Sequence, residues 1–209
     1  MIRQLLLEES NSILNTLEAS EYRIEEAVDI LYDCIRQSGL IFTCGAGASA
    51  LVAKEIAGQA LEIGVPCYPL TNDLSEAQPI SFCKGGYENE RGLASYYANL
   101  LRKGDSLIAI SASGETGFVC ELAQMTFGKL VMVICITENE DSRLAKFSHV
   151  VILTKGKPER PSATKTQTCA LVVGHSIMMA LANRFGVTDA DMVKFMQVEV
   201  IPSKPMGAK

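Results

Sequence analysis

Apolar residues recur with two different periods along this chain, and the period changes at Gly39. Up to residue 38 they repeat every three to four positions, which predicts helices over 1–19 and 22–38. Beyond Gly39, short runs that are apolar throughout alternate with amphipathic stretches. The runs predict strands at 40–44, 65–70, 106–111, 130–136 and 149–153, and the stretches predict helices up to about 63 and at 89–101, 115–128, 141–147 and 163–185. Uniformly apolar strands separated by helices indicate an α/β fold, with a doubly wound parallel sheet covered by helices on both faces.

No internal linker or repeat interrupts this alternation, so the chain is predicted to be a single structural domain. Within it, we expect the helices of residues 1–38 to pack on the remainder, residues 39–209, or on a partner subunit. A chain of 209 residues buries roughly 70% of its extended surface, enough for one sizeable core. Near the end, 192–200 is predicted to add a helix or an edge strand, and 202–209 to be loose.

Composition narrows the classes of function. The formal net charge of −5 argues against general nucleic-acid binding, so an anionic ligand must be recognised locally. The seven cysteines form no Cys-x-x-Cys pair and mostly lie in apolar runs, which favours reduced thiols in a cytoplasmic protein. Two histidines argue against a multi-histidine metal site. We also expect no signal peptide and no membrane span, because no apolar stretch approaches the ~20 residues that a span requires.

The segment that carries the most chemistry is Ser-Ala-Ser-Gly-Glu-Thr at 111–116, which we call the serine loop. It joins a predicted strand to a predicted helix, and the exposed amides of a helix N-terminus attract anions. The helix dipole contributes only about 0.3–1 kcal/mol, whereas a hydrogen bond to a charged group contributes roughly 1.5–3 kcal/mol. Converging hydroxyl and amide donors would therefore dominate, which predicts a phosphate site. The plainer alternative is a serine-rich helix cap, but three hydroxyls and Gly114 exceed what one cap needs.

Two further loops lie at the same carboxyl edge of the predicted sheet, where doubly wound folds bind their ligands. Gly-Ala-Gly-Ala-Ser at 45–49, the glycine loop, follows the first strand. It is a weak dinucleotide fingerprint, because Ala50 stands in place of the third glycine and no acidic residue ends the second strand. Pro-Ser-Ala-Thr-Lys-Thr-Gln-Thr at 161–168, the threonine loop, opens the last long helix with hydroxyls and a lysine.

In this order, the three loops resemble the sugar isomerase (SIS) domain family. The likeness runs from about residue 39 to residue 184 and is greatest to the isomerase half of glucosamine-6-phosphate synthase and to hexulose-phosphate isomerases. The resemblance implies a flavodoxin-like sheet, a phosphorylated sugar as ligand, no metal or other cofactor, and a homodimer or homotetramer in which a neighbouring subunit completes the site. The residues it assigns to the phosphate and the sugar are Gly45, Gly47, Ser49, Ser111, Ser113, Gly114, Thr116 and Ser162.

Two departures leave the subclass open. Residues 71–104 are more similar to the sedoheptulose-phosphate isomerase branch, and to stand-alone SIS proteins, than to the glucosamine-phosphate enzymes. Yet the histidine-bearing signature of that branch near the last helix is replaced here by Lys-Thr-Gln-Thr at 165–168.

Aldose–ketose isomerisation needs a base that removes a proton next to a carbonyl, and a glutamate whose pKa is raised toward about 6–7 suits that role. Glu76 and Glu88 are the preferred candidates, ahead of three other glutamates: Glu55, Glu90 and Glu159. Glu55 has a plain alternative as a solvated position paired with Gln59 on its helix. Glu88 and Glu90 also have a plain alternative, because a carboxylate near a helix N-terminus stabilises the helix.

Three other charged residues complete the set of candidates. Lys165 is expected to meet the phosphate or polarise a hydroxyl, because a lysine is otherwise unfavourable near a helix N-terminus. Glu115 lies inside the serine loop, and it is expected to point away because a carboxylate repels a bound phosphate. His175 is expected to be a core or subunit-interface residue rather than a catalytic one.

The sequence thus predicts a cytoplasmic, homo-oligomeric protein that binds a phosphorylated sugar and isomerises it by carboxylate-mediated proton transfer through an enediol. A lyase of the deglycase or etherase type would use the same proton abstraction on an amino-sugar phosphate. A non-catalytic phosphosugar sensor or protein adaptor is the alternative from another class, because no definite acid–base pair stands out.

Overall fold

The structure is a computed structural model that describes residues 2–72, 86–156 and 164–196. In these residues a five-stranded sheet has the order β2-β1-β3-β4-β5, and every neighbouring pair is parallel. Its strands are β1 (Ile41–Ala46), β2 (Cys67–Asn72), β3 (Ser106–Ile110), β4 (Met132–Thr137) and β5 (Val150–Leu153). Each strand ends within two residues of its predicted bounds. The predicted α/β fold with a doubly wound parallel sheet is confirmed.

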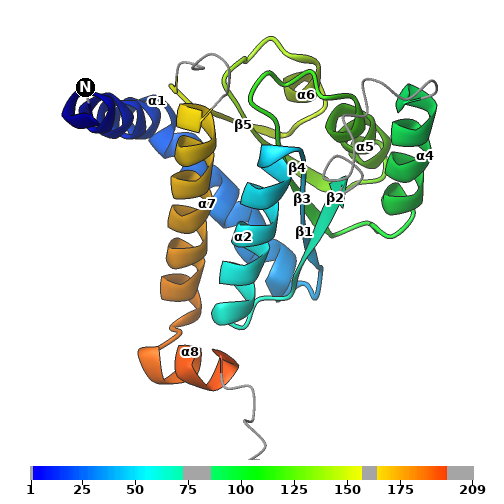
Figure 1. The fold of residues 1–209 in the computed structure, drawn as a ribbon. Helices are drawn as coiled ribbons and strands as arrows, with labels where there is room; N and C mark the ends of the chain where they lie inside the picture. The colour runs from blue at the N-terminus through cyan, green and yellow to red at the C-terminus, as the bar shows by residue number, and fades with distance from the viewer. Residues whose placement is uncertain (1, 73–85, 157–163, 197–209) are drawn as a thin grey trace, which may run out of the picture.

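Helices cover both faces of the sheet (Figure 1). One face carries α2 (Ala48–Glu62), α7 (Thr164–Phe185) and the second half of α1 (Ile2–Arg36). The other face carries α4 (Gly86–Ala98), α5 (Gly117–Phe127) and α6 (Arg143–Lys146). Successive strand residues alternate between the two layers, as Leu107 and Ile108 do on β3.

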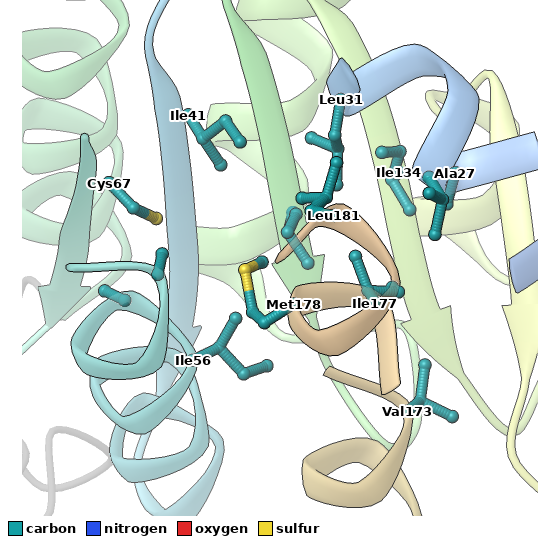
Figure 2. Close-up of a cluster of buried hydrophobic side chains, with 14 of the residues drawn as sticks. Ala27, Leu31, Ile41, Ile56, Cys67, Ile134, Val173, Ile177, Met178 and Leu181 are labelled. Carbon is teal, nitrogen blue, oxygen red and sulfur yellow. The ribbon is translucent and has the colours of Figure 1, made fainter. Parts of the chain in front are cut away.

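The larger of the two cores lies under α1, α2 and α7. Figure 2 shows Leu31 of α1, Ile56 of α2 and Ile177 of α7 gathered with the strand residues Ile41 and Ile134. All five side chains are fully buried. Burial of one such side chain contributes about 1.5–3 kcal/mol, so this layer anchors the sheet that carries the three loops.

α1 is one continuous helix of 35 residues, so the prediction of two helices over 1–19 and 22–38 is wrong. Neither Ser20 nor Glu21, between the predicted helices, is a residue that ends a helix. Ser20 Oγ also pairs with the edge of β5, donating to Leu153 O (2.9 Å) and accepting from Leu153 N (3.0 Å). One turn earlier, Thr16 Oγ1 accepts from Lys155 N (2.8 Å). Hydroxyls of α1 thus satisfy backbone groups at the edge of β5 and just beyond it.

The two halves of α1 have different surroundings. Ala27, Leu31 and Cys34 in the second half are buried in the core. The first half exposes a set of large apolar side chains: Ile2, Leu5, Leu6, Leu7, Leu14 and Leu17. A partner subunit against this half, and a boundary between residues 1–38 and 39–209, stay predictions.

α7 contains a stretch, 166–185, that is long and apolar enough to cross a membrane by length and composition. The expectation that no apolar stretch approaches that length is therefore wrong. The stretch contributes Val173, Ile177 and Leu181 to the core beside α1 and α2, so its apolar composition is that of a helix inside the domain.

The last described element is α8 (Asp189–Met196), which confirms the helical alternative for this region but begins three residues before the predicted 192. Its start is a reciprocal cap: Asp191 N donates to Thr188 Oγ1 (3.3 Å), and Thr188 N donates to Asp191 Oδ2 (3.2 Å). Residues 197–209, predicted to be loose from 202 on, lie outside the described residues.

Candidate functional site

The glycine loop and the serine loop lie beside each other at the carboxyl edge of the sheet. They follow β1 and β3, which pair directly although β2 separates them in the sequence. α2 leaves β1 toward one face of the sheet, and α5 leaves β3 toward the other (Figure 1). The strand order reverses here, and doubly wound folds bind ligands at such a switch point.

The glycine loop needs its two glycines for different reasons. A Cβ at Gly45 would lie 2.3 Å from Ser49 O, so only glycine lets the start of α2 pack this close to β1. Gly47 has φ 57° and ψ −132°, which L-residues rarely adopt, and it caps α2 without a side chain. Gly47 is exposed and Ser49 is half-buried. The loop therefore presents backbone amides and one hydroxyl at the edge of the sheet.

The first hydroxyl of the serine loop serves as an internal brace. Ser111 is buried, and its Oγ accepts from Gly114 N (3.1 Å) and hydrogen-bonds Thr116 Oγ1 (2.9 Å). Ser111 N in turn donates to Ile136 O (3.1 Å) on β4. These bonds hold the loop in a tight turn over the ends of β3 and β4.

The other two hydroxyls lie where the loop meets α5. Ser113 is exposed, and its Oγ accepts from Glu115 N (3.2 Å), so its own proton can be donated to a ligand. Thr116 occupies the N-cap position of α5, but its side chain makes no capping hydrogen bond. The plain alternative of a serine-rich helix cap is therefore not what the loop forms. The first-turn amides of α5 and these hydroxyls together make a donor-rich end of a helix.

Gly114 is required by its neighbours in the fold. Its φ is 69°, and a Cβ there would lie 2.1 Å from Ser142 Oγ and 2.3 Å from Ser142 Cβ. The resemblance to the SIS family assigns this glycine to the phosphate and sugar site. The structure supplies another reason, because the loop packs directly on the residue that precedes α6.

The Glu115 side chain, expected to point away from a phosphate on the serine loop, contacts α6. Its Oε1 accepts from Arg143 N (2.9 Å), the first amide of that helix. The side chain is exposed, and its loop neighbour Gly114 is buried.

The threonine loop is described only from residue 164 on, where α7 begins. Thr166 is buried, and its Oγ1 donates to Gly156 O (3.0 Å) and contacts Glu138 Oε1 in a short hydrogen bond. Glu138 N donates to Ala112 O (3.0 Å). The start of α7 is thereby tied to the serine loop through the end of β4, so these two of the three predicted loops are neighbours.

Four predicted site residues fall partly or wholly outside the described structure. Glu76 and Ser162 lie outside the described residues. Glu88 lies in the first turn of α4 and Lys165 in the first turn of α7, but their side chains are not among those described. Their roles stay predictions.

Glu90 of α4 is a carboxyl that sequence analysis ranked below Glu76 and Glu88. Burial raises its pKa, and a hydrogen bond with the Phe118 amide, in the first turn of α5, opposes that rise. α4 is held there by packing of the Tyr97 ring on the Phe118 ring, with 6.0 Å between ring centroids. No local pattern in the sequence pairs Glu90 with α5, because the contact crosses between two helices.

Two further candidates, Glu55 and His175, are exposed in the single chain. Glu55 is exposed and accepts from Gln59 Nε2 (3.4 Å), as its plain alternative predicted. His175 is exposed on α7, so the core interpretation of this histidine is wrong, and a subunit interface stays a prediction. Glu159 lies outside the described residues.

Comparison with known proteins adds a family and several relatives. A family model of the SIS domain matches residues 7–138. The phosphoheptose isomerase of Klebsiella pneumoniae is 27% identical over 187 residues, which cover 87% of this chain and 94% of that protein. The N-acetylmuramic acid 6-phosphate etherase 2 of Bacillus licheniformis is 26% identical over 169 residues, 74% of this chain and 53% of that protein, so this chain spans about half its length. A crystal structure from Bacteroides fragilis, of a protein described as a phosphosugar isomerase involved in capsule formation, superposes with a TM-score of 0.76 at 25% identity, covering 94% of this chain and 96% of that one.

The family match runs from α1 through β4 and includes both the glycine loop and the serine loop. It spans more than half of the 209 residues and agrees with the resemblance carried by the loop motifs. The strand order and the placement of both loops at the switch point accord with it. This chain belongs to the SIS domain family.

Proposed function

We propose that this protein binds a phosphorylated sugar at the carboxyl ends of β1 and β3 and interconverts its aldose and ketose forms. One observation carries the proposal: Thr116 stands at the N-cap of α5 without capping it, next to an exposed Ser113. A helix N-terminus whose hydroxyls do not cap the helix is suited to bind a dianion. The phosphoheptose isomerase from Klebsiella pneumoniae, which this chain covers almost completely, supports a phosphosugar as the ligand.

In this proposal the serine loop takes the phosphate. Ser113 and Thr116 donate hydroxyl protons to its oxygens, with the first-turn amides of α5, while Ser111 and Gly114 hold the loop in shape. Ser162 adds a hydroxyl from the threonine loop. The glycine loop borders the uncharged part of the sugar through Gly45, Gly47 and Ser49.

Proton transfer is assigned to carboxylates near the mouth of the site. A base removes the proton from the hydroxyl-bearing carbon next to the carbonyl while the carbonyl oxygen takes up a proton, which leaves an enediol. The proton then returns to the former carbonyl carbon, and the other hydroxyl of the enediol loses its proton to become the new carbonyl. Glu76 and Glu88 keep this role from the sequence analysis, with Lys165 polarising an oxygen. Glu90 joins them as a candidate, because its pKa is raised by burial at the start of α5.

We further propose a cytoplasmic homodimer or homotetramer. The support is the first half of α1, whose exposed apolar residues include Leu6, Leu14 and Leu17. Large apolar patches on a soluble chain mark interaction surfaces.

A second candidate function is the cleavage of an ether or amine from an amino-sugar phosphate. The similarity to the Bacillus licheniformis etherase favours it, although this chain spans about half the length of that protein. The same site and the same proton abstraction would serve, and only the bond that breaks afterwards differs.

Deuterium incorporation separates the candidate functions. The protein is incubated in heavy water with sedoheptulose 7-phosphate, a panel of other sugar phosphates, and N-acetylmuramic acid 6-phosphate, while thermal shifts report binding. An isomerase puts deuterium on carbon 1 or 2 of a ligand it binds, and an etherase opens the ether of the amino-sugar phosphate. Thermal shifts without exchange or cleavage would leave a sensor or adaptor, and the absence of any shift would remove the phosphosugar proposal.

The site itself is tested by Ser113→Ala combined with Thr116→Val. Loss of two hydrogen bonds to a charged group, roughly 1.5–3 kcal/mol each, should weaken ligand binding by several kcal/mol with the fold intact. Ser10→Ala combined with Ser176→Ala is a matched control, because both are exposed helix serines that bond their own helix. Equal affinities for the two double variants would contradict the site assignment.

A further inference from the structure

Two backbone carbonyls of the serine loop accept hydrogen bonds from other elements. Ala112 O accepts from Glu138 N (3.0 Å) and from Thr137 Oγ1 (3.2 Å) at the end of β4. Gly114 O accepts from Leu144 N (3.0 Å) of α6 and from Cys120 Sγ (3.2 Å) in the first turn of α5. These two oxygens, which would repel an anion, therefore have donors within the protein.

The charged acceptor of the loop, the Glu115 carboxylate, also has a donor in the protein. Glu115 Oε1 accepts from Arg143 N (2.9 Å), and Gly114 O takes the next amide, that of Leu144 (3.0 Å). The first two amides of α6 thus both donate hydrogen bonds to the serine loop.

The other two amides of the α6 first turn are satisfied locally. Ala145 N donates to Ser142 Oγ (3.3 Å), and Lys146 N donates to Ser142 O (3.2 Å). The bond from Lys146 N is the first intrahelical bond of α6, and the N-cap amide, Ser142 N, donates to Asn139 O (3.3 Å). All four N–H groups that a helix start leaves without an intrahelical partner, those of residues 142–145, therefore have acceptors. Since two of the acceptors belong to the serine loop, α6 and this loop form one hydrogen-bonded unit.

The placement of Glu115 matters because it is the charged side chain of a loop that takes a phosphate. If a released carboxylate approached a phosphate dianion from about 10 Å to about 5 Å, Coulomb's law in water gives about a fourfold loss of affinity, and more in a less polar site. An acceptor that holds the carboxylate elsewhere prevents this loss.

We propose that the Arg143 amide is a positioning group, which holds the Glu115 carboxylate on α6 and so keeps a negative charge out of the phosphate site. This inference rests on the proposed function of the serine loop. It assigns the short helix α6 a part in ligand binding without contact to the ligand.

The side chain of Arg143 makes contacts of its own, with α5. Its Nη2 donates to Gln124 Oε1 (3.2 Å) and forms a close ion pair with Glu121, whose side chain is only 8% exposed. Removing the guanidinium would disturb this buried carboxylate of α5. A test of the amide must therefore compare variants that both lack the guanidinium.

Alanine and proline at position 143 make that comparison. Both remove the guanidinium, but only proline removes the N–H that Glu115 accepts. Position 143 is the first residue of α6, where proline is well tolerated. Ser142 before it has φ −66° and ψ 162°, an extended conformation that a following proline allows.

The experiment measures the dissociation constant for inorganic phosphate by amide NMR, at low and high salt. We expect Arg143→Pro to bind phosphate about fourfold more weakly than Arg143→Ala at low salt, with a smaller difference at high salt. Adding Glu115→Gln to both should abolish the difference, because the repelling charge is gone. Equal affinities of the two Arg143 variants, or a difference that survives Glu115→Gln, would overturn the inference.

A second measurement does not depend on phosphate or on the folding of the proline variant. In the otherwise unchanged protein, Glu115→Ala should shift the Arg143 amide proton resonance and speed its exchange with solvent. An unaffected Arg143 amide would overturn the inference while leaving the proposed function intact. Absence of any phosphate effect on the α5 amides of the unchanged protein would instead remove the proposed function, and this inference with it.

Discussion

Replacing Gly114 by alanine imposes two separable costs on the serine loop. The first is backbone strain, because φ is 69° and an L-residue in the left-handed region costs about 1–2 kcal/mol. The second is collision, because the new carbon would lie 2.3 Å from Ser142 Cβ. Rotation of the Ser142 hydroxyl cannot relieve that contact, so the backbone of the loop or of α6 must move. Overpacking of this kind costs about 1–3 kcal/mol.

Gly114→Ala should therefore destabilise the protein by about 2–5 kcal/mol, a large part of a domain's 5–15 kcal/mol. Gly186→Ala is the matched control, because φ is 66° there and no atom of the described residues lies within 4 Å of the added carbon. Its cost should be the strain alone, about 1–2 kcal/mol.

A compensating change tests the collision directly. Ser142→Gly removes the clashing carbon, and glycine at an N-cap costs only a few tenths of a kcal/mol. Gly114→Ala combined with Ser142→Gly should thus return to a destabilisation of about 1–2 kcal/mol. Urea unfolding followed by circular dichroism gives each value from the midpoint at constant slope. If Gly114→Ala costs no more than Gly186→Ala, or if Ser142→Gly recovers nothing, the packing of the serine loop on α6 is not what requires this glycine.

Further predictions concern other parts of the fold. His149 Nδ1 accepts a hydrogen bond from Val133 N (3.0 Å), and burial lowers the pKa of His149 below 6.5. The neutral imidazole therefore stabilises the fold above pH 6.5, and this contribution is lost as the pH falls below that value. The urea midpoint of His149→Asn should fall less between pH 7 and pH 5 than that of the unchanged protein, and an equal fall would contradict this. Ser20→Ala should cost about 1–3 kcal/mol by urea unfolding, because the Leu153 amide and carbonyl at the edge of β5 lose their partner, whereas the exposed Ser176→Ala should be nearly neutral. Burial raises the pKa of several thiols, to about 12 for Cys67 and about 11 for Cys120 and Cys135. These thiols should therefore resist a thiol reagent at pH 8 until the protein unfolds. Rapid labelling of the folded protein would contradict their burial.

Local patterns account for the elements of the fold. Uniformly apolar strands such as β3 and β4 can exist only between two covering layers, so their composition predicts a parallel sheet with helices on both faces. α1 shows the limit of this reasoning. Ser20 bonds Leu153 of β5, more than a hundred residues away in the sequence, and no period in the local sequence carries that information.

In the serine loop, too, some properties follow from the local sequence and others from the tertiary structure. Its hydroxyls, its glycine and its place between strand and helix are properties of six consecutive residues, and these indicated an anion site. Together with the other two loops they indicated the SIS domain family, to which the chain belongs. Why Gly114 must be glycine and where the Glu115 carboxylate goes were decided by Ser142 and Arg143 of another segment. Residue types determine which contacts a loop is able to make, but the partners that satisfy its donors and acceptors come from chain segments that meet only when the sheet has formed.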